Sequence, residues 1–188
     1  MIRHLAVAAA LALGAPLPAR AQDRPAITPS RDVDVTYRMN AGDRVLQQRM
    51  RWRVAAQKLR VDPPTAGLYM IVDLRDHRIA LVRDADRRVA ELDAPAAGAM
   101  PGAAPGSAFI REGTDSVAGL ACTDWRTTDS AGAPTLACIT SDGVLLRARS
   151  GGRTLVEAIL VRYAPQDPTL FQPPADYQRV TLPPPPAR

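Results

Sequence analysis

Histidine, aromatic residues and lysine are scarce in this chain. It has two histidines, and aromatic residues make up 4% of its 188 residues. His4 lies in an N-terminal apolar segment, so His77 is the one histidine left for a Ser-His-Asp or Cys-His site, and its neighbours Asp76 and Arg78 predict an exposed turn. No serine lies in a Gly-x-Ser-x-Gly elbow, and no glycine-rich loop could cradle a phosphate. We therefore expect a non-catalytic protein with no catalytic residues, no cofactor and no metal.

Closely spaced carboxylates leave one class of enzyme open. The pairs are Asp32/Asp34, Asp73/Asp76 and Asp84/Asp86. Two carboxylates can hydrolyse a glycosidic bond, but the aromatic platforms that such sites use are scarce here. The Asp84-Ala-Asp86 segment lacks the later glycine and glutamate of a calcium loop. A hydrolase is therefore the third alternative, behind two kinds of binding protein.

No apolar run reaches the ~20 residues that span a bilayer, and the longest one lies at the N-terminus. Arg3 and His4 precede the run Leu5 to Leu13, and Ala19-Arg20-Ala21 supplies a small-x-small cleavage pattern. This order predicts a cleavable signal peptide over residues 1–21, cut after Ala21, and export to the periplasm. An ordinary N-terminal helix is the alternative.

The net charge is small once the predicted signal peptide is removed. The chain has 24 basic and 19 acidic residues, and residues 1–21 contain two arginines and no acid, which leaves 22 against 19. We therefore expect no nucleic-acid partner. Arg49, Arg51 and Arg53 alternate along one predicted strand and could contact an anionic lipid or an acidic protein surface. The alternative is a solvated sheet face with acids on neighbouring strands.

Cys122 and Cys138 are the two cysteines of the chain. In an oxidising compartment such a pair predicts a disulfide. Strand-like segments on both sides of a turn centred on Ser130 would place the two cysteines opposite each other in a symmetric hairpin. Two reduced buried thiols are the alternative, and two cysteines without histidines cannot complete a tetrahedral metal shell.

Apolar and polar residues alternate through most of the chain after residue 32, which predicts half-buried strands joined by short turns. Strands are expected around residues 33–39, 46–54, 59–61, 68–74, 79–82, 88–92, 109–127, 135–140, 144–149 and 153–163, with a turn of helix over 165–171. The fold class is mainly β: a curved antiparallel sheet with little helix, doubled or curved to bury one face. We expect a flexible segment over 22–31, one β-rich domain over 32–180, an Ala/Gly/Pro loop over 93–107 and a proline-rich tail over 181–188.

Two short motifs and the C-terminal residues carry a family resemblance. These are Val117-Ala-Gly-x-x-Cys-x-x-Trp125, the strand end Ser141-Asp-Gly-Val144, and the series Tyr163, Pro165, Phe171, Pro173-Pro174 and Tyr177. Together they resemble the periplasmic LolA/LolB-like superfamily, especially its uncharacterised DUF4412-type members, over residues 32–180. The resemblance implies an unclosed half-barrel whose concave face takes lipoprotein acyl chains, and a related domain occurs in an envelope-stress regulator.

The chain departs from the carriers of this superfamily at its N-terminus. Carriers cover the concave face with helices, one of which precedes the first strand, whereas residues 22–31 contain Pro25 and Pro29 and are too few for that helix. The 93–107 loop and the 165–171 turn are the remaining candidates for a cover.

We therefore expect an exported binding module for an apolar ligand, either an acyl chain or a lipoprotein segment. The candidate ligand-binding residues share the apolar face of their predicted strands: Met39, Met50, Trp52, Met70, Val72, Leu81, Ile159 and Val161. A filled core made of the same residues is the alternative for this set. The alternative function is an interaction or regulatory domain that binds another envelope protein through a sheet edge or the arginines.

Overall fold

The computed structural model describes residues 24–93, 107–129 and 131–181. The predicted signal peptide, nearly all of the 93–107 loop and the proline-rich tail beyond Thr181 lie outside these residues. The strands are β1 (Val33–Ala41), β2 (Arg44–Arg53), β3 (Lys58–Asp62), β4 (Leu68–Asp73), β5 (Arg78–Arg83), β6 (Arg88–Asp93), β7 (Ile110–Val117), β8 (Leu120–Thr128), β9 (Pro134–Ile139), β10 (Leu145–Ser150), β11 (Arg153–Tyr163) and β12 (Gln178–Thr181). Three short 3-10 helices are η1 (Val54–Ala56), η2 (Asp84–Asp86) and η3 (Pro168–Phe171).

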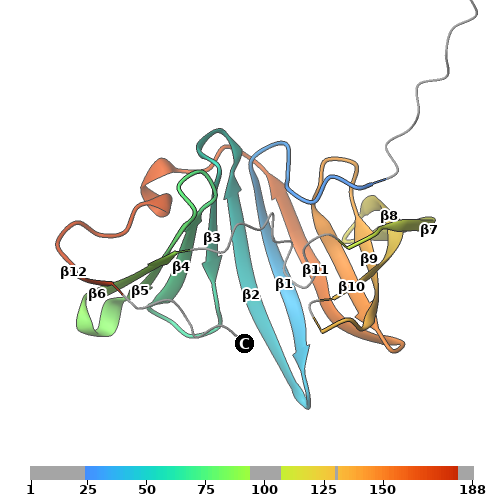
Figure 1. The fold of residues 1–188 in the computed structure, drawn as a ribbon, viewed down its shortest axis with the longest axis horizontal. Coiled ribbons are helices and arrows are strands. Elements are labelled where there is room, and N and C mark those ends of the chain that lie inside the picture. The colour runs from blue at the N-terminus through green and yellow to red at the C-terminus, as the bar shows by residue number, and fades with distance from the viewer. Residues whose placement is uncertain (1–23, 94–106, 130, 182–188) are drawn as a thin grey trace, which may run out of the picture.

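All twelve strands form one curved sheet (Figure 1). Their order is β12-β6-β5-β4-β3-β2-β1-β11-β10-β9-β8-β7, and every pair is antiparallel except β12 with β6. The two edge strands, β12 and β7, do not pair with each other, so the sheet is open. The predicted mainly β, curved and unclosed sheet is confirmed, although β12 was not expected. No helix in the described ranges is long and apolar enough to cross a membrane.

An apolar row crosses five adjacent strands on the face that we call the inner face. Cross-strand partners share a face of a sheet, and the register pairs Val35 with Met50, Met50 with Val61, Val61 with Met70, and Met70 with Leu81. The first three of these residues are buried. The period-two alternation of the sequence therefore places its apolar residues on this inner face, and the arginines of β2 on the outer face.

A β-bulge changes the alternation in β11. Thr36 of β1 pairs with Leu160, but the next residue, Tyr37, pairs with Ala158, so Ile159 is an extra residue without a partner. A bulge shifts the parity of the strand that contains it. Ala158 and Val161 therefore contribute to the inner-face core, whereas Ile159 is 40% exposed.

The outer face of β4–β6 is also covered. Ile71, Val82 and Val89 lie next to inner-face residues in their strands and therefore point outward, yet they are 3%, 0% and 0% exposed. The segment of residues 164–177, which we call the C-terminal strap, contains η3 and reaches this face, because the Arg60 Nη1 donates a hydrogen bond to the Leu170 carbonyl at 3.0 Å. Phe171 of η3 is fully buried. The sequence suggested the 165–171 turn as a candidate cover for the concave face. The structure places this turn on the opposite face, so it does not cover the concave face.

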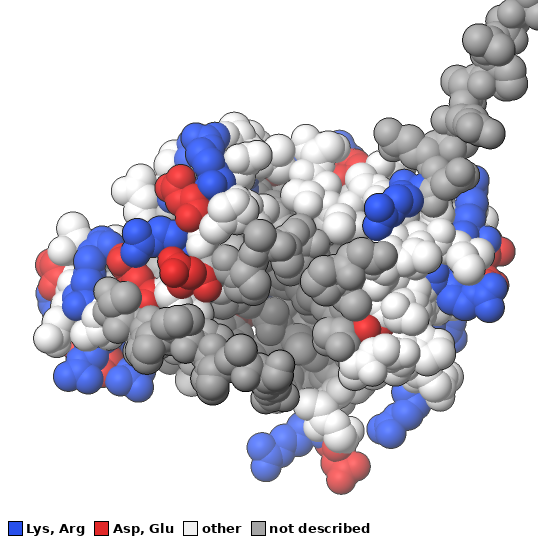
Figure 2. All heavy atoms as spheres, viewed as in Figure 1, with Lys and Arg blue, Asp and Glu red and all other residues white. Residues whose placement is uncertain are grey.

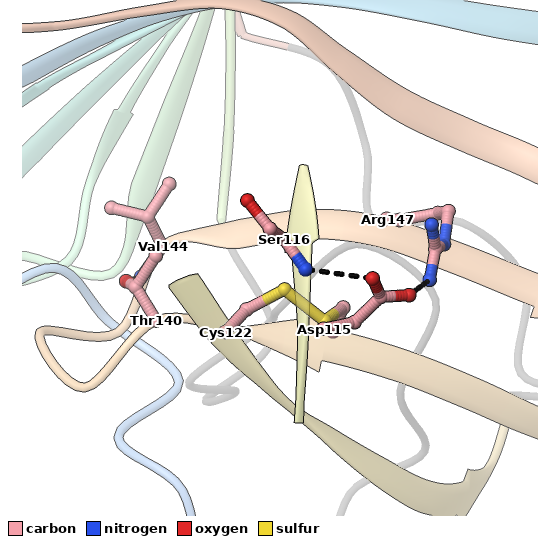
Figure 3. Close-up of a disulfide and its surroundings, with 7 residues drawn as sticks. Asp115, Ser116, Cys122, Thr140, Val144 and Arg147 are labelled. Carbon is pink, nitrogen blue, oxygen red and sulfur yellow. Dashed lines mark hydrogen bonds and ion pairs between the residues drawn. A yellow bond between two sulfur atoms is a disulfide. The ribbon is translucent and has the colours of Figure 1, made fainter. Parts of the chain in front are cut away.

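The cysteines form the predicted disulfide, with 5.4 Å between their Cα atoms (Figure 3). They are diagonal neighbours rather than directly opposed, because Cys138 pairs with Asp124 and the hairpin turn is centred one residue later than expected. Arg147 of β10 extends beside the disulfide to the Asp115 carboxylate of β7. The disulfide links β8 to β9 and the ion pair links β7 to β10, so the two contacts connect the four strands at this end of the sheet.

Candidate functional site

A partly open cavity of about 350 Å³ lies on the inner face between two walls. One wall comes from β1, β2 and β11, and the other comes from β8–β10. The N-terminal segment of residues 24–31 closes part of the rim. The apolar lining residues are Ile27, Pro29, Tyr37, Met39, Met50, Trp52, Ala137, Gly143, Val144, Leu145, Ala148, Leu155 and Val156, and the polar ones are Asn40, Gln48, Thr127, Asp129 and Thr135.

Three of the eight predicted ligand-binding residues line this cavity: Met39, Met50 and Trp52. Met70, Val72 and Val161 lie on the inner face and pack against its core, and Leu81 is half-buried in the apolar row. Ile159 lies at the β11 bulge and does not line the cavity. The structure therefore gathers the β1 and β2 residues of the set at one site and leaves the β4, β5 and β11 residues outside it.

The opposite wall could not be placed from the sequence. Ala137, Leu145 and Ala148 lie in strands whose hydrophobicity predicts a core, and nothing in the pattern shows which of them border an empty volume. The available signal was a pair of small side chains. Ala137 and Ala148 are cross-strand partners, and two paired alanines leave space on that face of the sheet.

Tyr37 links the two walls. Its hydroxyl donates a 2.7 Å hydrogen bond to the Leu145 carbonyl, and the contact is buried. Burial is the main cause that raises the pKa of Tyr37, and the nearby Tyr163 adds to it. The hydroxyl therefore stays protonated and keeps its role as a donor between β1 and β10.

The N-terminal segment is anchored where β9 turns into β10. The Ser30 amide donates to the Asp142 carbonyl at 2.9 Å, and the Arg31 Nε donates to the Asp142 carboxylate at 2.8 Å. The same carboxylate accepts hydrogen bonds from the hydroxyls of Thr140 and Tyr163. We call this group the Asp142 junction. It positions Ile27 and Pro29 at the rim of the cavity.

The backbone of the N-terminal segment passes unusually close to Gly143. This residue has a φ of +90°, and a Cβ atom added to it would lie 2.3 Å from the Thr28 carbonyl oxygen. Only glycine permits both the positive φ and this close approach. The Ser141-Asp-Gly-Val144 motif therefore acts as a docking point for residues 24–31.

The predicted anion-contacting arginines lie on the outer face, away from the cavity. Arg49 forms a two-bond ion pair with Asp34, and Arg51 pairs with Asp62 at 3.2 Å. Burial is the largest cause that lowers the pKa of Arg51. No ion pair of Arg53 is found within the described residues. Two of the three charges are thus compensated by neighbouring strands, which disfavours an anion site here.

The other candidate polar residues have structural roles. Asp32 accepts hydrogen bonds from the amides of Val54 and Gln166, and so ties the C-terminal strap to β1. Asp73 accepts from the amides of Arg75 and Asp76 in the β4–β5 turn, where His77 is exposed. Within the described residues, no cluster of three His, Cys, Asp or Glu side chains could hold a metal ion.

Few charged residues border the cavity among the described residues. In Figure 2 most of the Lys, Arg, Asp and Glu side chains in view lie toward the two ends and the lower margin of this face. Asp129 is the single charged residue among the described residues that line the cavity.

No family model and no curated protein matches this chain, so the DUF4412-type assignment is without support from either. The chain is similar to solved structures. An uncharacterized conserved protein from Thermus thermophilus superposes with a TM-score of 0.60 at 14% identity, over 81% of this chain and 91% of that one. A chain of the Pseudomonas aeruginosa MucA/MucB complex superposes with a TM-score of 0.57 at 14% identity, over 82% of this chain and 59% of that one. PNGF-II superposes with a TM-score of 0.55 at 11% identity, over 81% of this chain and 31% of that one.

This chain spans less than two thirds of the last two structures, and identities this low concern the fold alone. MucB has a LolA-like fold. The resemblance inferred from the sequence is therefore supported at the level of the fold: the protein has an open, LolA-like and MucB-like antiparallel sheet.

Proposed function

We propose that this protein is an exported, non-catalytic binding module of the periplasm that holds an apolar ligand, such as a lipid acyl chain or an acylated protein segment, in the inner-face cavity. The observation that carries the proposal is the cavity itself. Its volume of about 350 Å³ lies within the ~300–1,000 Å³ of small-molecule sites. Its walls are mostly aliphatic side chains, and methionines such as Met39 and Met50 adapt to ligands of different shape.

Export is supported by the predicted signal peptide, by the disulfide and by the fold that the chain shares with MucB. Disulfides persist in oxidising compartments and are rare in the cytosol. Leu155 gives the binding site an accessible entrance, because it lines the cavity and is 41% exposed.

A charge at the entrance tests the proposal. Leu155→Glu places a carboxylate where the apolar ligand enters and is expected to weaken binding of N-phenyl-1-naphthylamine, an apolar fluorescent probe, by about tenfold or more. Leu160→Glu is the matched control, because Leu160 lies in the same strand, is similarly exposed at 45%, and pairs with Thr36 on the outer face. Fluorescence titration measures both affinities.

Equal binding by the two variants would contradict the proposed site, and absence of probe binding by the wild type would contradict the proposed function. Native mass spectrometry of protein purified from the periplasm would then identify the bound lipid or show an empty protein.

A protein partner is the second candidate. A related fold was solved in the MucA/MucB complex, and in this protein β7 is an edge strand whose residues Ile110 to Ser116 are all exposed. A free strand edge can pair with a strand of another chain. A photo-crosslinking residue at Ile110 should capture that partner in the cell envelope, and the same residue at Val45, exposed at the tip of the β1–β2 hairpin, should not.

A further inference from the structure

The polar part of the cavity lining has a marked charge bias. Four of its five polar residues are neutral, namely Asn40, Gln48, Thr127 and Thr135, and the fifth is Asp129. Neither lysine nor arginine lines the cavity within the described ranges. A ligand carboxylate or phosphate in the cavity would therefore lose its hydration without gaining a counter-charge, which is strongly unfavourable.

Asp129 is fixed in place at this site. Its Oδ1 accepts hydrogen bonds from the amides of Ala131 at 2.9 Å and Ala133 at 2.8 Å, in the turn between β8 and β9. The side chain is half-buried. It cannot move away from an anionic ligand without losing these two hydrogen bonds, so it opposes a second negative charge in the cavity.

The arginines of the adjoining N-terminal segment do not supply the missing positive charge. Arg24 donates to the Ser107 carbonyl at 3.1 Å, and Arg31 is held in the Asp142 junction. The charge of Arg31 is thus paired with a carboxylate, Arg24 is exposed, and neither residue lines the cavity.

The neutral groups of the lining offer hydrogen bonds instead. Thr127 is 5% exposed, and its Oγ1 is buried without a hydrogen-bond partner among the described residues. Gln48, half-buried on the opposite wall, brings an amide that can both donate and accept. Unsatisfied buried polar groups are rare in folded proteins, so a group that borders a cavity is a candidate partner for a ligand.

From these observations we propose that the cavity selects an acyl chain carrying an uncharged amide or ester and discriminates against a free fatty-acid carboxylate. The inference rests on the proposed function and specifies its ligand class. The chain packs against Met39, Met50 and Leu155, and the neutral linkage takes hydrogen bonds from the polar lining residues, including Thr127. Asp129 excludes the anion.

Competition between two ligands of equal chain length tests this selectivity. N-methyldodecanamide and dodecanoate, each below its micelle concentration at pH 8, are titrated against the mature protein loaded with N-phenyl-1-naphthylamine. The amide is expected to displace the probe at a concentration about tenfold or more lower than dodecanoate. Equal displacement, or stronger displacement by dodecanoate, would overturn the inference.

Two substitutions assign the selectivity to residues. Asp129→Asn removes the charge but keeps an Oδ1 acceptor for the turn. In this variant the affinity for dodecanoate should rise to nearly that for N-methyldodecanamide. Thr127→Val should weaken binding of N-methyldodecanamide several-fold without lowering the stability of the protein, because the hydroxyl that it removes has no partner among the described residues. A merely structural threonine would lose stability and leave the amide affinity unchanged. If neither the probe nor either ligand binds the wild type, the proposed function fails together with the inference. If both ligands bind equally well, only the inferred selectivity fails.

Discussion

At the scale of single residues, Asp142 and Gly143 decide whether the N-terminal segment stays on the sheet. Asp142 provides the charge and Gly143 provides the space, and both belong to the tight turn that leads into β10. The two contributions can be separated, because one depends on pH and the other on steric fit.

Gly143→Ala should be clearly more destabilising than a similar substitution elsewhere. The matched control is Gly132→Ala, since Gly132 has a φ of +82° but no atom within 4 Å of an added Cβ. An alanine at positive φ costs about 1–2 kcal/mol, which we expect for the control. Gly143→Ala adds the clash with the Thr28 carbonyl and should cost about 1–3 kcal/mol more. Urea unfolding measures both, and equal losses would show that residues 24–31 do not dock as described.

The Asp142 junction should weaken in acid. Burial alone would raise the pKa of Asp142, but the hydrogen bonds from Thr140, Arg31 and Tyr163 outweigh it and lower the pKa below its ordinary value. The unfolded chain then binds the proton more readily, so the stabilisation is complete at neutral pH and is lost as the pH falls below ~4.

Asp142→Asn should consequently make the free energy of unfolding less dependent on pH between about 5 and 3. At neutral pH the variant should be less stable than the wild type by ~1.5 kcal/mol, the value of a hydrogen bond to a charged group. Urea midpoints at several pH values test this. A variant that keeps the full acid sensitivity of the wild type would assign that sensitivity to other carboxylates.

At the scale of elements, the C-terminal strap makes the β4–β6 end of the sheet a two-sided core. Inner-face apolar residues pack on one side, and Ile71, Val82, Val89 and Phe171 are buried on the other. The Arg60 guanidinium lies 3.7 Å from the centre of the Tyr69 ring and bonds to the strap, so a polar side chain spans the edge of this second core.

Phe171→Ala should destabilise the protein by about 3 kcal/mol, because it removes a fully buried ring and leaves a cavity. Gln172→Ala, at the exposed neighbouring residue, should change stability by less than ~0.5 kcal/mol. Thermal or urea unfolding of the two variants provides the comparison. A small effect at Phe171 would mean that the strap contributes little to the fold.

The strands were predictable from the sequence because their signal is local. The alternation from Val33 to Met39 and the Gly151-Gly152 turn fix β1 and the β10–β11 hairpin without reference to the rest of the chain. The β11 bulge was not predictable, since Ile159 and Leu160 are both apolar and either could have continued the pattern. The placement of Ile159 on the binding face depended on an unbroken alternation.

The outer-face core and the parallel strand β12 were missed for a different reason. Continuous hydrophobicity from Leu68 to Leu74 shows that both faces of β4 are covered, but the covering segment lies far later in the sequence and has almost no periodicity of its own. The β1 and β2 lining residues Met39, Met50 and Trp52 follow from strand parity. The opposite wall depends on how the sheet curves, which no local pattern shows.

At the scale of the whole molecule, the strands in the middle of the sheet pair on both sides, whereas the two edge strands pair on one side only. β1 pairs along most of its length with both β2 and β11, and it lies at the centre of the strand order. β12 has four residues and one partner, and β7 is an exposed edge. Opening of a sheet begins where few buried contacts hold a strand.

Amide hydrogen exchange should therefore show a graded pattern. The slowest amides are expected in β1, β2 and β11, and the fastest strand amides in β12 and in the free edge of β7. Mass spectrometry of peptic peptides can resolve these segments. Slow exchange in β7 of the purified protein would indicate that its edge is covered, for example by a second copy of the chain.

The pairing of β1 with β11 also affects the order in which the molecule can fold. Val35 and its partner Val161 lie near opposite ends of the domain sequence, so closure of this seam carries a large entropy cost and is expected to be slow. Until β11 has been made, the β1–β6 meander is an incomplete sheet whose first strand has an open edge and an uncovered apolar face. During that interval the chain is at its most vulnerable to aggregation, and the finished binding cavity, which takes its walls from both sides of the seam, does not yet exist.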